Sequence, residues 1–265
     1  MMRNSVAAFS VAFFALVSSA NAQSLSRRVS DARDGTVQFS FASRPGVCGD
    51  GATYVRDGFG DDNRIYEGGN FSGRSRGGDD WPPCIRGPVR VVATVSGGDV
   101  IRLRTFAGPR PEATVEDRRD LGLVSVDDAV AFLTHLVDQT HARAASEAIL
   151  PLVLADSTTP WPTLLRFARD ERLSRSERST VAFWLARGAA AALGVTGHEE
   201  TDDDEVRSSA VFALSQQPKD FAIPRLIDVV RHNSHPAARA QALFWLGQSN
   251  DSRALDLFEE ILQRR

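Results

Sequence analysis

The chain has 265 residues, of which 42% are hydrophobic and 25% are charged, and its formal net charge is −3. This composition is typical of a folded protein. A charge so small and so mixed in sign excludes a strongly basic nucleic-acid-binding protein and gives an anionic membrane no electrostatic reason to bind.

Residues 1–22 are predicted to form a secretory signal peptide. Arg3 precedes an apolar stretch over 6–17, and small residues precede Gln23 at the expected cleavage site. The apolar stretch is shorter than the roughly 20 residues of a membrane-spanning helix, and Gln23 replaces the cysteine of a lipoprotein. We therefore expect an exported chain, periplasmic or extracellular, with no stable membrane anchor after cleavage.

Residues 24–108 are predicted to form a small β-rich domain. Apolar and polar residues alternate over 37–41 and over 89–95, which is the period of a strand with one buried face. The second run continues through a Gly-Gly step at 97–98 into 100–105, a pattern typical of a hairpin. The rest of this domain fits several β architectures.

Cys48 and Cys84 are the two cysteines of the chain. In an oxidising compartment they are expected to form a disulfide, and the alternative is two free thiols. The glycine-rich segment between them has little apolar content, and the crosslink would stabilise the fold by about 3 to 4 kcal/mol. Prolines and charges after this domain predict a linker over 109–124.

Residues 125–265 are predicted to be helical, because apolar residues recur there with the spacing of amphipathic helices. The stripe Ile223, Leu226, Ile227 and Val230 returns 31 residues later as Ala254, Leu257, Phe258 and Ile261. A second motif is found three times, around Phe183, Phe212 and Phe244, each with an arginine before it and a leucine after it. Each motif and the stripe that follows it predict one helical hairpin.

Three segments resemble HEAT repeats, in the short bacterial form called PBS-lyase HEAT-like: VRSSAVFAL, ARAQALFWLG and DSRALDLFEEIL. The resemblance implies a mainly α protein in which about four HEAT-like hairpins over 125–265 form an α-solenoid, with the second helix of each pair on the concave side. The β-rich, disulfide-closed domain precedes this solenoid. Residues 188–205 depart from the pattern, and we expect a long helix followed by a loop there.

The aromatic residues of the repeated motif are interpreted as core. Phe183, Phe212 and Phe244, with Trp184 and Trp245, have the helical spacing of a packed seam between adjacent hairpins. A ligand cage is the alternative. If the seam is buried, Phe244→Ala would cost about 3 to 5 kcal/mol.

No catalytic residue, cofactor or metal is predicted. The sequence has no nucleophile elbow, P-loop or dinucleotide-binding signature. His198-Glu199 is similar to one of the His-Glu pairs of HEAT-repeat deoxyhypusine hydroxylases, whose di-iron site needs several such pairs. His232 and His235 supply two ligands where zinc needs three or four, and the acidic string 57–63 lacks the order of a calcium loop.

The surface of the second helices is the candidate binding site. Charged residues of both signs are predicted there: Arg166, Arg169, Arg225, Asp228, Arg231 and Glu259. Mixed charge predicts a protein or peptide partner, or equally salt bridges between neighbouring repeats.

We predict an exported, non-enzymatic scaffold or adaptor. One alternative is a metal-dependent or bilin-lyase-like enzyme, or a subunit of one, and another is a structural protein of the cell envelope.

Overall fold

The structure is a computed structural model, which describes residues 24–59, 64–66, 71–72, 82–109, 118–139, 143–196 and 202–264. The predicted signal peptide, the His198-Glu199 pair and residues 60–63 of the acidic string lie outside these residues. In chain order the elements are α1 (Leu25–Ser30), β1 (Gly35–Phe41), β2 (Val47–Gly49), β3 (Tyr54–Asp57), β4 (Arg64–Tyr66), β5 (Phe71–Ser72), β6 (Val89–Ser96), β7 (Asp99–Ala107), β8 (Arg118–Leu123), α2 (Val126–Gln139), α3 (Arg143–Leu154), α4 (Trp161–Arg169), α5 (Arg175–Ala192), α6 (Asp202–Ser215), α7 (Lys219–His232), α8 (Pro236–Gln248) and α9 (Ser252–Gln263).

Four strands form the main sheet, in the order β7-β6-β1-β8. Strand β6 pairs antiparallel with β1 and with β7, and β8 pairs parallel with β1. The predicted hairpin is confirmed: Ser96 pairs with Asp99, and Gly97 and Gly98 between them both have positive φ, as a type I′ turn requires. The two runs of alternating residues are therefore neighbouring strands of one sheet.

Part of the expected linker over 109–124 is a strand, because residues 118–123 form β8 on the edge of the main sheet. Its side chains are mostly exposed, and its only apolar residues besides Gly122 are Leu121 and Leu123. Backbone pairing with β1 holds it in place, and the Gln38 amide donates a hydrogen bond to Asp120 at 3.0 Å. The Arg28 guanidinium donates another to the carbonyl of Leu121 at 3.0 Å.

A second sheet has the order β2-β3-β4-β5, with every neighbouring pair antiparallel. The predicted disulfide is confirmed: Cys48 of β2 is bonded to Cys84, which precedes β6. Beside it, the Tyr54 hydroxyl donates a hydrogen bond to the carbonyl of Pro82 at 2.7 Å. These two links fasten residues 82–85 to the β2–β3 hairpin.

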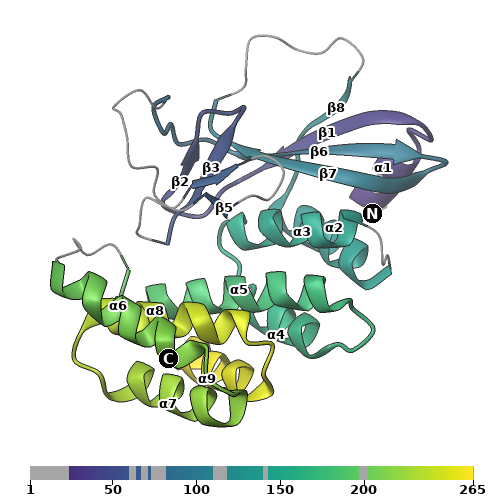
Figure 1. Cartoon of the computed structure of the whole chain (residues 1–265). Coiled ribbons are helices and arrows are strands. Elements are labelled where there is room, and N and C mark those ends of the chain that lie inside the picture. The colour runs from purple at the N-terminus through teal and green to yellow at the C-terminus, as the bar shows by residue number, and fades with distance from the viewer. Residues whose placement is uncertain are drawn as a thin grey trace, which may run out of the picture.

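Helices α2 and α3 cover one face of the main sheet (Figure 1). The ring of Phe39 on β1 meets Phe132 of α2 edge to face, with centroids 5.6 Å apart. Strand β7 is fastened to α3, because the Glu147 carboxylate accepts a hydrogen bond from the Leu103 amide at 2.7 Å. Buried residues of both sheets and of the helices form one continuous hydrophobic core.

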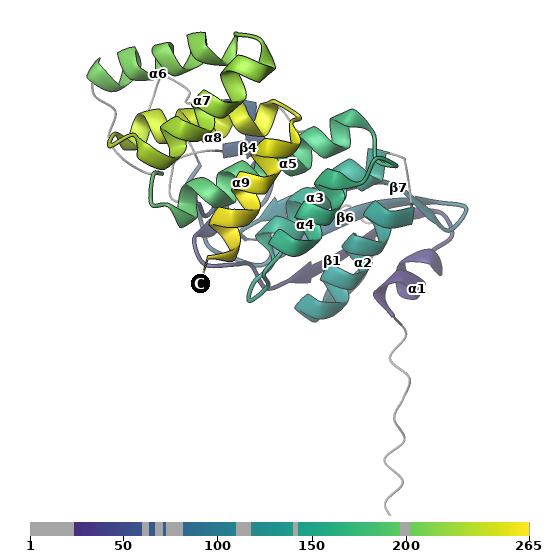
Figure 2. The ribbon, with the colours of Figure 1, turned by 90° about the horizontal axis from the view of Figure 1, so that it is seen from below.

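The remaining helices form two layers whose order in space differs from their order in the chain. In one layer α8 lies between α5 and α6, and in the other α9 lies between α4 and α7. Figure 2 shows the pair α8–α9 between α4–α5 and α6–α7. A regular solenoid stacks its repeats in chain order, so this array of helical pairs departs from the expected solenoid.

Helix α5 packs against α8 and α9. The helix begins with a capping box in which Ser174 and Glu177 exchange hydrogen bonds, and it ends at Ala192. The expected long helix is α5, whereas residues 202–205, which were expected in the loop after it, are the start of α6, and residues 197–201 lie outside the described residues. Helix α9 also packs against α4. Gly247 lets α8 approach α5, since a Cβ there would lie 2.9 Å from the Ala186 Cβ.

Candidate protein-interaction surface

A buried ion pair holds the helical array against the second sheet. Asp57, at the end of β3, is fully buried, and Arg187 of α5 binds its carboxylate through Nε at 3.1 Å and Nη2 at 2.8 Å. Phe59 contacts Trp161 of α4 and Trp184 of α5, with centroids 6.0 and 6.4 Å apart. We call these five residues the junction. Asp57 opens the acidic string considered for calcium, and its carboxylate binds an arginine instead.

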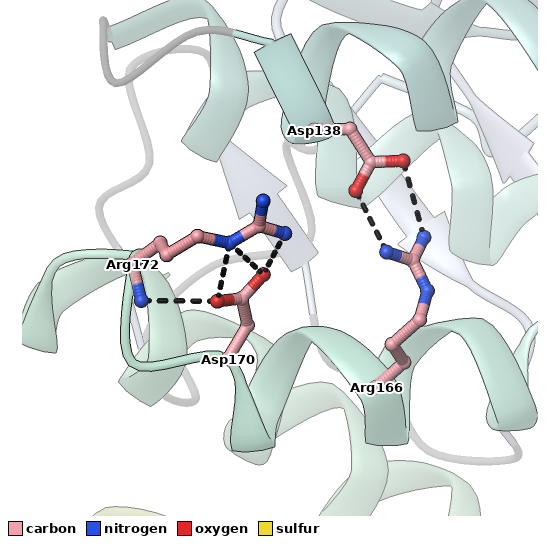
Figure 3. A network of polar contacts seen from close by, with 4 residues as sticks. All are labelled: Asp138, Arg166, Asp170 and Arg172. Carbon is pink, nitrogen blue, oxygen red and sulfur yellow. Dashed lines mark hydrogen bonds and ion pairs between the residues drawn. The ribbon is translucent and has the colours of Figure 1, made fainter.

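Four of the six predicted binding residues take part in ion pairs between neighbouring helices, here called the charged ladder. The ladder begins where Arg166 of α4 binds Asp138 of α2 by two hydrogen bonds of 2.7 and 3.2 Å (Figure 3). Just after α4, Arg172 binds Asp170, and these hydrogen bonds hold the pKa of the Asp170 carboxyl at about 2. The ion pair between Arg166 and Asp138 therefore joins α4 of the helical array to α2, which covers the sheet.

The ladder continues on both sides of α9. Arg169 of α4 donates hydrogen bonds to Asp256 at 2.9 Å and to Glu259 at 2.6 Å. On the opposite side, Arg231 of α7 donates one to Glu260 at 2.7 Å. Hydrogen bonds from these arginines lower the pKa of both glutamates. Because the pairs are exposed, they brace the helices only weakly.

Arg225 and Asp228 bind within α7 instead of reaching another helix. The Arg225 guanidinium lies 3.4 Å above the ring centroid of Phe221 and donates a hydrogen bond to its carbonyl at 3.1 Å. Asp228 lies 2.7 Å from Nδ1 of His232. Both side chains remain exposed to solvent. A binding role for any of the six residues stays a prediction.

The expectation that Phe212 and Phe244 are core residues is wrong. Their side chains are 46% and 40% exposed, whereas Phe183 and Trp184 are buried as predicted. Phe212 of α6 and Phe244 of α8 both pack against Trp245, with ring centroids 5.2 and 5.0 Å from its own. We call Phe212, Phe244 and Trp245 the aromatic cluster.

The small residues of α8 explain why this cluster is exposed. The buried residues of α8 are Ala237, Ala238, Ala242, Leu243, Leu246 and Gly247. Successive residues of a helix point about 100° apart, so a helix that buries Leu243 and Gly247 turns Phe244 outward. The sequence could have indicated this exposure, because three consecutive bulky residues, 243–245, cannot all lie on one narrow face of a helix.

The aromatic cluster has the chemistry of a binding hot spot. Aromatic residues are enriched at the centres of protein interfaces, because their rings supply a large apolar area while few rotatable bonds are immobilised. The cluster spans α6 and α8, two helices whose packing fixes the relative position of the rings. The rings therefore form a preformed apolar surface.

Metal and membrane chemistry are not evident in the described part of the chain. There, no group of three or more His, Cys, Asp or Glu side chains gathers as a metal site requires. The described helices include none that is both long and apolar enough to cross a membrane.

Comparison with known proteins identifies the repeats. The family model described as HEAT repeats matches residues 195–265, the segment that holds α6 to α9 and the aromatic cluster. No curated protein and no solved structure matches the chain. Residues 195–265 are therefore HEAT repeats, and they include the helical pairs α6–α7 and α8–α9.

Proposed function

We propose that this chain is an exported, non-enzymatic adaptor that binds a protein partner through the aromatic cluster. HEAT repeats in general mediate protein–protein interactions. The observation that carries the proposal is the exposure of Phe212 and Phe244 beside Trp245, inside the matched repeats. Apolar rings left in solvent at one place favour a partner that covers them.

The energetics favour the aromatic cluster over the charged ladder as the anchor. Full burial of a phenylalanine is worth about 1.5 to 3 kcal/mol, so covering the exposed part of Phe212 and of Phe244 supplies about 1 kcal/mol each. Ring packing adds about 0.5 to 1.5 kcal/mol for each aromatic pair formed. Ladder residues already have partners, so a ligand must replace one exposed ion pair by another. Arg225 and Asp228 are the polar contacts that we retain from the predicted set.

Export is part of the proposal. The disulfide supports an oxidising compartment, because intracellular reductants keep most cysteines reduced. The predicted signal peptide 1–22 would deliver the chain there. The junction then gives the adaptor its rigidity, since it fixes the helical array against the disulfide-bonded sheet.

Capture of a partner by matched variants tests the proposal. The exported chain is used as bait in four forms: wild type, Phe212→Ser with Phe244→Ser, Arg225→Glu with Asp228→Arg, and the control Leu123→Ser. Leu123 is an exposed apolar residue on β8, remote from the array in sequence. We expect a protein that wild type and control retain and that the aromatic variant loses at least about tenfold, the effect of about 1.4 kcal/mol.

Two results would count against the proposal. If the partner is retained by the aromatic variant but lost by the charge-reversed variant, the binding site lies on α7 instead of on the aromatic cluster. Stoichiometric iron or zinc in the purified protein would favour the enzyme alternative.

A further inference from the structure

The Cys48–Cys84 disulfide lies on the edge strand β2 of the second sheet, and its two ends differ in exposure. Cys48 is 8% exposed, whereas Cys84 is half-buried and lies between the exposed residues Pro83 and Ile85. A reagent in solution therefore reaches the bond from the side of Cys84.

The second sheet has little apolar surface of its own with which to stay folded. Its strands are two to four residues long. The buried apolar side chains described on these strands, besides Cys48, are Val47, Tyr54, Val55 and Ile65. Small units of this kind commonly rely on a crosslink for much of their stability. The disulfide is therefore expected to contribute a large share of the stability of this sheet.

The disulfide is one residue away from the contacts that hold the junction. In the antiparallel pair of β2 and β3, Val47, the neighbour of Cys48, lies opposite Asp57. The turn before β2 packs against the residue after Asp57, because a Cβ at Gly58 would lie 2.8 Å from the carbonyl oxygen of Pro45. Strand β2 and its turn therefore position the part of the junction that belongs to the second sheet.

We propose that the disulfide is a redox-sensitive latch, whose reduction loosens β2, β3 and the junction while helices α7 to α9 stay folded. A dithiol supplies the two electrons. One of its thiolates attacks Sγ of Cys84, forms a mixed disulfide and displaces Cys48 as a thiolate, which takes up a proton. The second thiol of the reductant attacks the mixed disulfide and releases Cys84. The products are two cysteine thiols and the oxidised dithiol.

Two features of the packing make the loosening local and reversible. Beside the disulfide, the backbones of Gly49 and Ile85 exchange hydrogen bonds of 3.1 and 3.0 Å. These bonds keep the two cysteines near each other after reduction, so the disulfide is able to form again. Helices α7 to α9 pack on one another and, through α8 and α9, on α5, and reduction leaves these contacts in place.

Hydrogen exchange followed by mass spectrometry tests the proposal on the full exported chain, with the disulfide intact, after reduction by dithiothreitol and after reoxidation. The cysteines are 36 positions apart, and a crosslink of this span is worth more than a factor of ten in an unfolding equilibrium. The amides of 47–59 should therefore exchange at least about tenfold faster in the reduced chain. Those of α7 to α9 should keep their rates, and reoxidation should restore the slow exchange of 47–59.

A variant without the disulfide separates its loss from other effects of the reductant. Cys48→Ser with Cys84→Ser should exchange like the reduced wild type, and dithiothreitol should not change it further. If this variant fails to fold, reduction of the folded wild type still decides the question.

Three results would overturn the inference. One is equal exchange of 47–59 in the oxidised and reduced chains, and another is a disulfide that the dithiol reduces only in denaturant. The third is faster exchange throughout α7 to α9, which would show that the disulfide stabilises the whole molecule. The adaptor proposal is tested separately, because partner capture uses the chain with its disulfide intact.

Discussion

Removal of the Asp57 carboxylate should destabilise the whole protein, because it leaves Arg187 buried without its acidic partner. The Asp57 side chain is 0% exposed and that of Arg187 is 13% exposed, and two hydrogen bonds join them. The Asp57 carboxylate also accepts a hydrogen bond from the Phe59 amide at 2.9 Å. Breaking a buried ion pair by removing one partner costs about 3 to 5 kcal/mol. We expect Asp57→Ala to lower the free energy of unfolding by that amount.

Urea denaturation followed by tryptophan fluorescence measures this loss, since Trp161 and Trp184 both contact Phe59 of the junction. Glu260→Gln is the control: it removes the exposed ion pairs of Glu260 with Arg231 and Arg264, and exposed pairs contribute so little that its cost should be under about 1 kcal/mol. A loss no larger for Asp57→Ala than for Glu260→Gln would refute the view that the junction holds the array.

Other consequences of the packing are measurable by thermal or chemical unfolding. Gly188→Ala would place a Cβ 2.4 Å from the Trp161 ring. We expect a net loss of stability, because overpacking costs about 1 to 3 kcal/mol and helix propensity returns about 1 kcal/mol. A variant more stable than wild type would contradict the close approach of α4 and α5. Phe244→Ala removes a side chain that is 40% exposed and should cost about 1 to 2 kcal/mol, whereas Trp184→Ala should cost about 3 to 5 kcal/mol; equal costs would show that both are core. Hydrogen bonds from two arginines lower the folded pKa of Glu260 below its ordinary 4.5, so this pairing stabilises the fold above that pH and is lost as the pH falls through the lower folded pKa. The difference in Tm between wild type and Glu260→Gln should therefore disappear in acid, and a difference that persists there would exclude the ion pair as its cause.

Local pattern was sufficient wherever neighbours in sequence are neighbours in structure. The alternation over 37–41 and 89–95 identified β1 and β6, and the Gly97-Gly98 step identified the hairpin to β7, because strand period and turn conformation are properties of a few consecutive residues. The helical stripes located α7 and α9 for the same reason. Two cysteines leave one possible pairing, so the disulfide also followed from composition.

Strand β8 shows where local pattern fails. It begins with three charged residues and has only Leu121 and Leu123 as apolar residues, too few to predict a strand, and it pairs with β1, far away in the chain. The junction is a similar case. Asp57 and Arg187 are 130 positions apart in the chain, and no sequence pattern around either residue indicates that they pair.

The sequence by itself determined the helical pairs, the HEAT repeats and one buried stripe for most helices. It could do so because the spacing of apolar residues along a helix indicates which of its sides is apolar. Only the tertiary structure decided which helix covers which stripe. Helix α9 lies between α4 and α7, and α8 lies between α5 and α6, so that α6 and α7 lie at the end of the array. Several helices have apolar stripes of similar composition, so more than one of them could pack against the same neighbouring helix. Contact areas and loop lengths decide which helix does so, and the stripe alone does not specify them.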